Sequence, residues 1–150
     1  MNQWSQLRPL SKLDQLAETI MKSAFLISES HNVIQSYLNH KGSNFKIHNR
    51  VGEQEFEILC RQINIEKTNY AFVRKSDLER GLRDDLWIGL VLFIDGQKPT
   101  KYLFPSTVWS EPNQLFTDTS IQNPEYGISL NKKTIEQLQE YSFEKQIDKL

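Results

Sequence analysis

The sequence predicts an α+β domain in which helices pack on a central mixed or mostly antiparallel sheet. Three observations predict it: helical spacing of apolar residues near the start of the chain, alternation in the middle, and helical spacing again near the end. The most apolar stretch, residues 86–94, contains no charged or polar side chain. It is too short to cross a bilayer, which takes about 20 apolar residues. We therefore expect a central strand that is buried on both faces.

Size and charge limit the classes of function. The chain has 150 residues, a length that suits a single domain over residues 1–150. Its 18 Lys and Arg and 19 Asp and Glu leave a net charge of -1, so no overall charge attracts nucleic acid or anionic membranes. The N-terminus lacks the apolar core of a secretory signal, which favours a cytoplasmic protein without membrane contact. Cys60, the single cysteine, is expected to be a buried free thiol.

Two helices are expected before residue 42. Ser11 can cap the first, because apolar residues recur from Leu13 to Ala24 at a spacing that places them on one buried stripe. After a polar break at residues 28–30, apolar residues at 33, 34, 37 and 38 resume the helical spacing. Gly42 is well suited to end this second helix.

From residue 45 the apolar period changes to two, which is typical of strands with one buried face. Residues 45–48 and 56–65 are expected to form a hairpin around a turn at 51–54, as the start of a β-meander. The elements expected after it are a strand at 70–73, a short helix or turn at 76–82, the central strand, a neighbouring strand at 101–104, one helical turn after Ser106, an ordered loop over 110–127 and a last helix over about 132–141.

No familiar metal or nucleophile motif is present. His31, His40 and His48 are far apart in the sequence, and no Cys-x-x-Cys or His-Glu-x-x-His occurs. There is likewise no Gly-x-Ser-x-Gly and no glycine-rich phosphate loop. We therefore expect no cofactor, with Mg²⁺ as the exception under one alternative hypothesis given below.

Several segments in the middle of the chain together carry a resemblance to a known family. The most specific segment is Leu-Phe-Pro-Ser-x-x-Trp at residues 103–109. The other segments are 57–61, 69–73, the apolar strand that ends at Phe93, and 124–128, so the resemblance covers roughly residues 45–130. In this series the chain resembles a family of small bacterial proteins related to the restriction-endonuclease-like, or PD-(D/E)xK, nucleases, which implies a restriction-endonuclease-like fold.

The resemblance also implies where a catalytic site would lie. Active members place an acid on the first hairpin strand, and an acid or Gln and a Lys two residues apart on the second. Their carboxylates hold Mg²⁺. Here the first acid falls near Asn44 or His48, the second falls on Leu59, and the Lys falls on Arg61. An arginine can grip a phosphate but is a poor base, so the resemblance implies a site too degenerate to cleave DNA.

A divergent Mg²⁺-dependent nuclease is the alternative hypothesis. Glu55 and Glu57 lie on one face of a strand, and Asp84 or Asp85 could complete a site for a hard cation. Such a site needs at least two of these carboxylates within about 5 Å of each other.

The remaining hypotheses concern binding. Arg61, Arg74 and Lys75 are candidate binding residues, although acidic residues interleave with the basic ones nearby. Tyr70, Phe72 and Tyr102 are either packing residues or a stacking face for single-stranded nucleic acid. We expect a binding or regulatory module for a protein partner, a second copy of itself or nucleic acid. A third hypothesis is a purely structural, oligomer-forming protein.

Overall fold

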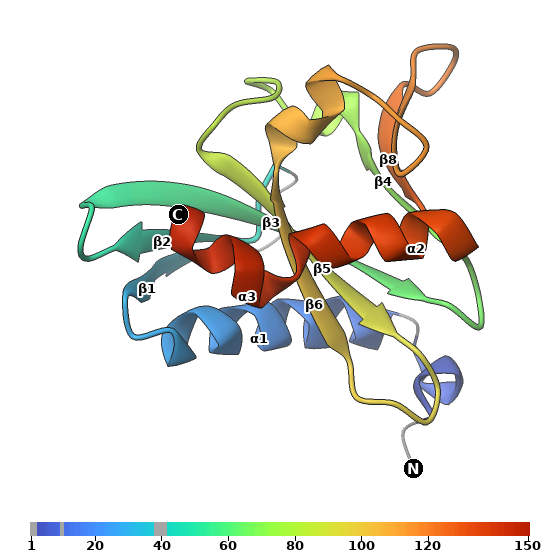
Figure 1. The fold of residues 1–150 in the computed structure, drawn as a ribbon, viewed down its shortest axis with the longest axis horizontal. Helices are drawn as coiled ribbons and strands as arrows, with labels where there is room; N and C mark the ends of the chain where they lie inside the picture. The colour runs from blue at the N-terminus through green and yellow to red at the C-terminus, as the bar shows by residue number, and fades with distance from the viewer. Residues whose placement is uncertain (1–2, 10, 38–41) are drawn as a thin grey trace.

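Two β-sheets form the framework of the computed structural model, which describes residues 3–9, 11–37 and 42–150. In the larger sheet, β3 and β5 run parallel and the other neighbouring pairs are antiparallel. Its strands, in spatial order, are β1 (His31–Ser36), β2 (Phe45–Asn49), β3 (Gln54–Asn64), β5 (Leu86–Phe93) and β6 (Thr100–Pro105) (Figure 1).

The smaller sheet is antiparallel, and the segment between β3 and β5 contributes one of its strands. Its strands, in spatial order, are β4 (Tyr70–Arg74), β8 (Glu125–Ser129) and β7 (Phe116–Thr119). After β3 the chain leaves the larger sheet, adds β4 to the smaller one and returns as β5 beside β3. Two parallel neighbours need such a crossover, because a tight turn would make them antiparallel.

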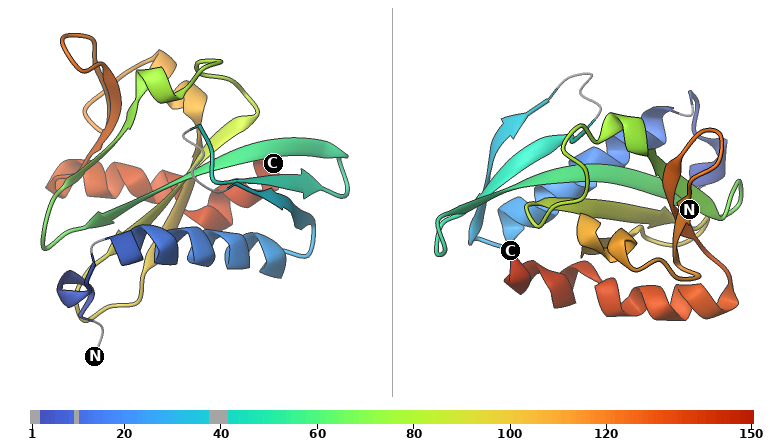
Figure 2. Two further views of the ribbon diagram at one scale, coloured as in Figure 1. Left: turned by 180° about the vertical axis from the view of Figure 1, so that it is seen from behind. Right: turned by 90° about the horizontal axis from the view of Figure 1, so that it is seen from above.

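Helices cover both faces of the larger sheet (Figure 2). α1 (Ser11–Ile27) lies along one face, whereas α2 (Lys132–Leu138) and the short α3 (Phe143–Gln146) lie on the opposite side. α2 begins where it does because the Asn131 side chain accepts hydrogen bonds from two backbone amides of its first turn. The 3-10 helices are η1 (Trp4–Gln6), η2 (Lys75–Asp77), η3 (Ser106–Ser110), η4 (Gln139–Tyr141) and η5 (Ile147–Lys149).

The hydrophobic core has two parts, separated by the larger sheet. Against α1, Met21 and Phe25 pack on residues such as Ile58. On the other face, Leu59 belongs to the cluster that reaches the smaller sheet, α2 and Trp109. Side chains of successive β3 residues therefore pack in opposite halves of the core, because they alternate between the two faces of a strand.

Several sequence predictions are confirmed. The molecule is α+β with a mixed central sheet. The first helix begins at Ser11, β2 and β3 form the expected hairpin, and all residues of β5 are buried. Cys60 is a buried free thiol. No helix in the described ranges combines the length and the apolar character needed to span a bilayer.

The predicted second helix is wrong. Residues 31–36 form strand β1, which pairs with β2 in an antiparallel register. Only four apolar residues supported the helical spacing, and long-range pairing with β2 overrides so weak a local preference. His40 and the end of the predicted helix lie outside the described residues.

The β-meander is also wrong, because β4 joins a different sheet from β3 and β5. β4 has one buried and one more exposed face, so it needs a core on one side only. The expected loop over 110–127 contains β7 and the start of β8, which complete that smaller sheet. The expected helix or turn at 76–82 begins as the 3-10 helix η2.

Candidate functional site

The four acidic residues of the nuclease hypothesis lie at one end of the parallel β3–β5 pair. The backbone amide of Glu57 donates to the carbonyl of Asp85, at 2.8 Å. Glu55, Glu57 and Asp85 line one cavity of about 180 Å³. Asp84 lines a neighbouring cavity that also contains Glu55. The parallel pairing therefore brings together two acidic pairs that are distant in the sequence.

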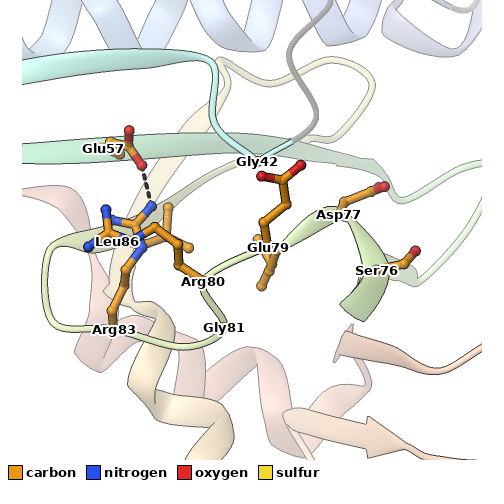
Figure 3. Close-up of a pocket in the computed structure, with 10 residues that line it drawn as sticks. Gly42, Glu57, Ser76, Asp77, Glu79, Arg80, Gly81, Arg83 and Leu86 are labelled. Carbon is orange, nitrogen blue, oxygen red and sulfur yellow. Dashed lines mark hydrogen bonds and ion pairs between the residues drawn. The ribbon is translucent and has the colours of Figure 1, made fainter.

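An arginine lies between these carboxylates. Nη2 of Arg83 donates to the Glu57 carboxylate (Figure 3). Nη1 of Arg83 donates to Oδ1 of Asp85 at 2.7 Å. Burial by itself would lower the pKa of Arg83, but the hydrogen bonds to Glu57 and Asp85 raise it above its ordinary value. Glu57 and Asp85 thus share one guanidinium as their cationic partner.

Ser106 holds Arg83 in this position. The backbone amide of Arg83 donates to Oγ of Ser106 at 3.0 Å, and the Ser106 hydroxyl donates back to the Arg83 carbonyl at 2.8 Å. Ser106 is fully buried and belongs to the Leu-Phe-Pro-Ser-x-x-Trp motif. The sequence did not predict this pairing, because nothing local indicates that the two residues meet across 23 positions.

Of the other two acidic residues, Glu55 also has a cationic partner. Glu55 pairs with Lys46 at 3.6 Å. In the part of the chain that the structure describes, no group of three or more His, Cys, Asp or Glu side chains is arranged to hold a metal ion.

A cavity of about 390 Å³ opens beside this network (Figure 3). Glu57 and Arg83 form one side of it, and Asp77, Glu79 and Arg80 from the η2 region form another part of its lining. Acidic and basic side chains are mixed in this lining, so the cavity has no single sign of charge with which to attract an ion.

The positions that the resemblance assigns to catalysis hold the fold together. Oδ1 of Asn44 accepts from the backbone amide of Cys60 at 2.7 Å, and its Nδ2 donates to Oε1 of Glu18 at 3.0 Å. Leu59 is buried in the core, and His48 faces Glu55 across the hairpin. Glu18 itself was not predicted, since a helical glutamate has no distinctive motif.

Arg61 joins β3 to β4. Its Nε donates to the carbonyl of Phe72 at 2.9 Å, and its Nη1 donates to the carbonyl of Cys60 at 2.8 Å. Burial lowers the pKa of Arg61 from its ordinary value, and burial raises that of the Cys60 thiol.

Two of the three candidate binding residues meet in one place. Arg61 and Arg74 line an open pocket of about 400 Å³ together with Gln62, Thr68, Tyr70, Ala71, Phe72 and Asp77, which we call the arginine–aromatic groove. The third candidate, Lys75, lies elsewhere, paired with Asp118 at 2.5 Å and over the ring of Tyr126.

The aromatic part of this groove is a stacked pair. The rings of Tyr70 and Phe72 have centroids 6.1 Å apart and an interplanar angle of 21°. Phe72 is 40% exposed. The hydroxyl of Tyr70 donates to Glu125 at 2.5 Å, and burial together with this bond raises the pKa of Tyr70 to about 12. Tyr102, the third aromatic candidate, is instead buried in the core.

The remaining histidine is structural. His31 is buried, and its Nε2 lies 3.1 Å from the carbonyl of Leu150, while its Nδ1 lies 3.1 Å from Oγ of Ser28. These contacts connect β1 to Leu150, and His31 lines none of the cavities described above.

No protein-family model, curated protein or solved structure matches the chain.

Proposed function

We propose that this chain is a nuclease-like domain with a degenerate catalytic site, and that it binds single-stranded nucleic acid in the arginine–aromatic groove. The observation that carries the proposal is the outer face of β4. Tyr70, Phe72 and Arg74 alternate along this strand on its less buried side, and Arg61 adjoins them from β3. Membership of the PD-(D/E)xK superfamily and a cytoplasmic location belong to the same proposal.

This combination of side chains suits an unpaired nucleotide strand. An exposed aromatic ring can stack on any base, which contributes about 1–3 kcal/mol per base. The guanidiniums of Arg61 and Arg74 can bind phosphate oxygens through charge-assisted hydrogen bonds. Because a base within a duplex is already stacked, we expect the groove to prefer single strands.

Loss of cleavage follows from Arg83. A divalent cation at Glu57 and Asp85 would have to displace the guanidinium that now hydrogen-bonds to both carboxylates. Asn44 and Leu59 supply no carboxylate at the positions where the resemblance implies one. Binding without cleavage is therefore the function that this geometry supports best.

Fluorescence anisotropy with a labelled single-stranded oligonucleotide tests the binding. We expect salt-dependent association, weakened about tenfold by Phe72→Ala and by Arg74→Ala. Arg50→Ala, at an exposed position on the turn after β2, is the matched control and should bind as tightly as the wild type. Equal binding by all four proteins, or none by the wild type, would contradict the proposal.

A cleavage assay separates binding from catalysis. Single- and double-stranded DNA incubated with the protein and Mg²⁺ or Mn²⁺ should remain intact. Metal-dependent cleavage that Glu57→Ala abolishes would instead establish the nuclease alternative.

A further inference from the structure

A second pocket lies at the opposite end of β3 from Arg83. It has a volume of about 280 Å³ and is bounded by the N-terminal segment, the start of α1 and the turn after β3. We call it the amide pocket. Its lining residues are Arg8, Leu13, Gln62, Asn64, Lys67 and Thr68.

Two carboxamides in this lining each leave one group without a hydrogen-bond partner. Asn64 is only 4% exposed, and its Oδ1 accepts from the backbone amide of Glu66 at 3.2 Å, but its Nδ2 has no partner. Nε2 of Gln62 donates to Oδ1 of Asp14 at 3.2 Å, but its buried Oε1 has no partner. The partners that are present fix which atom is oxygen and which is nitrogen.

Two residues that line one cavity therefore carry an unpaired donor and an unpaired acceptor, both of which are buried behind the cavity surface. Gln62 and Asn64 are two residues apart on β3, so their side chains project from the same face of the strand. Buried polar groups in native proteins are nearly always paired, because an unpaired one loses its water without compensation. Rotation about the terminal torsion, which is soft in Asn and Gln, would turn each unpaired group toward the cavity at the expense of the bond to Asp14 or to Glu66.

We propose that the amide pocket binds the edge of a nucleobase. Nδ2 of Asn64 donates to a ring nitrogen or carbonyl of the base, and Oε1 of Gln62 accepts from a neighbouring N–H. The volume suits one small planar ligand, near the lower limit for small-molecule sites. Arg8 and Lys67 supply positive charge for the phosphate that accompanies the base.

This inference deepens the proposed function and rests on it for the source of the base. Gln62 and Thr68 line both the amide pocket and the arginine–aromatic groove. A strand stacked on Phe72 can thus place one of its bases in the amide pocket. A free mononucleotide presents the same base edge and phosphate, so the experiment must distinguish the two sources.

Titration of the ¹⁵N-labelled protein with uridine 5′-monophosphate, followed by NMR, tests the pocket directly. We expect the side-chain amide signals of Asn64 and Gln62 to shift. The N3-methylated nucleotide, which lacks the N–H that Gln62 would accept, should bind about tenfold more weakly. Unchanged Asn64 and Gln62 signals would overturn the inference and leave water as the only occupant.

Variants provide a second readout. Gln62→Met and Asn64→Leu should each weaken nucleotide binding about tenfold. Gln15→Leu, at an exposed position on α1, is the matched control and should have no effect. Because Asn64→Leu also removes the bond to Glu66, circular dichroism must confirm its fold, and Gln62→Met carries the test if that variant does not fold. Equal affinity of Gln62→Met and wild type would contradict the inference.

Competition separates this inference from the proposed function. If a strand supplies the base, saturating uridine 5′-monophosphate should lower oligonucleotide affinity. If the nucleotide binds but no oligonucleotide does, the proposed function fails and the pocket serves a free nucleotide. If the oligonucleotide binds with the expected loss in Phe72→Ala, but no base enters the amide pocket, only the present inference fails.

Discussion

The two ends of β3 differ in how their polar groups are satisfied. At the first end, Glu57 and Asp85 share Arg83 as a cationic partner, although the buried Nε of Arg83 has no hydrogen-bond partner. At the other end, Gln62 and Asn64 each leave one amide group without a partner. The first end has more charge, yet the second is where we propose that a ligand binds. A dense group of acidic residues is thus a poor guide to a site when a neighbouring cation already binds them.

Strand pairing accounts for part of this difference. β2 pairs with β3 only from Gln54 to Ile58. Beyond that point, no described strand of the larger sheet pairs with β3 on that side. Both the arginine–aromatic groove and the amide pocket lie along this second half of β3. A strand edge without a partner leaves room for a ligand, whereas the paired half is closed by its own side chains.

The largest effect is expected at the closed end. Arg83→Met should lower the free energy of unfolding by about 2 kcal/mol, because it leaves Glu57 and Asp85 without their shared cation. The figure lies below that for a fully buried pair, since the side chains of Arg83 and Glu57 remain 18% and 22% exposed. Urea denaturation measures it, with Arg50→Met as the matched surface control.

Adding Glu57→Gln to Arg83→Met sharpens the same comparison. The second substitution removes the uncompensated charge, so the double variant should be more stable than Arg83→Met alone, and the double-mutant cycle should show coupling of about 1 kcal/mol or more. Strictly additive effects would mean that the network contributes nothing as a unit.

Tyr70 gives a pH-dependent effect near the open end. Its pKa rises from 10.0 to about 12 in the folded protein, so folding favours the neutral phenol. The resulting stability is complete below about pH 10 and is lost as the pH rises through about 12. When urea unfolding is measured between pH 9 and 11.5, the free energy of unfolding should fall less with rising pH in Tyr70→Phe than in the wild type. Tyr126→Phe is the control, and identical alkaline slopes for Tyr70→Phe and wild type would be contrary to this account.

The smallest effect on stability is expected at the open end. Gln62→Met removes a buried acceptor that has no partner, which should stabilise the fold, and it also removes the hydrogen bond to Asp14, which should destabilise it. The free energy of unfolding should therefore change by less than about 1 kcal/mol, measured by urea denaturation. A loss as large as that of Arg83→Met would show that Gln62 is already satisfied in the folded protein.

Local patterns in the sequence were sufficient for some elements and not for others. Three elements were predictable because each has a distinct apolar pattern. The pattern is helical spacing in α1, alternation in the β2–β3 hairpin and an unbroken apolar run in β5. β1 was not, since four apolar residues fit a helix as well as an edge strand. The smaller sheet depends on pairs such as Tyr70 with Ser129, which no local pattern reports.

The candidate sites followed the same division. The sequence located the acidic residues of β3 and β5 and the arginines of the groove, because residue type alone identifies them. It could not indicate that Arg83 lies between Glu57 and Asp85, which requires the parallel register of the two strands. Nor could it identify the amide pocket, since there the decisive feature is which atoms of Gln62 and Asn64 lack partners.

The most direct test of the central claim is an anomalous-scattering measurement at the manganese edge on a crystal soaked in Mn²⁺. We expect Arg83 to keep both carboxylate bonds, with no anomalous peak between Glu57 and Asp85. A peak within about 2.2 Å of both carboxylates, with the Arg83 side chain displaced, would contradict the claim that this end of β3 is closed to metal.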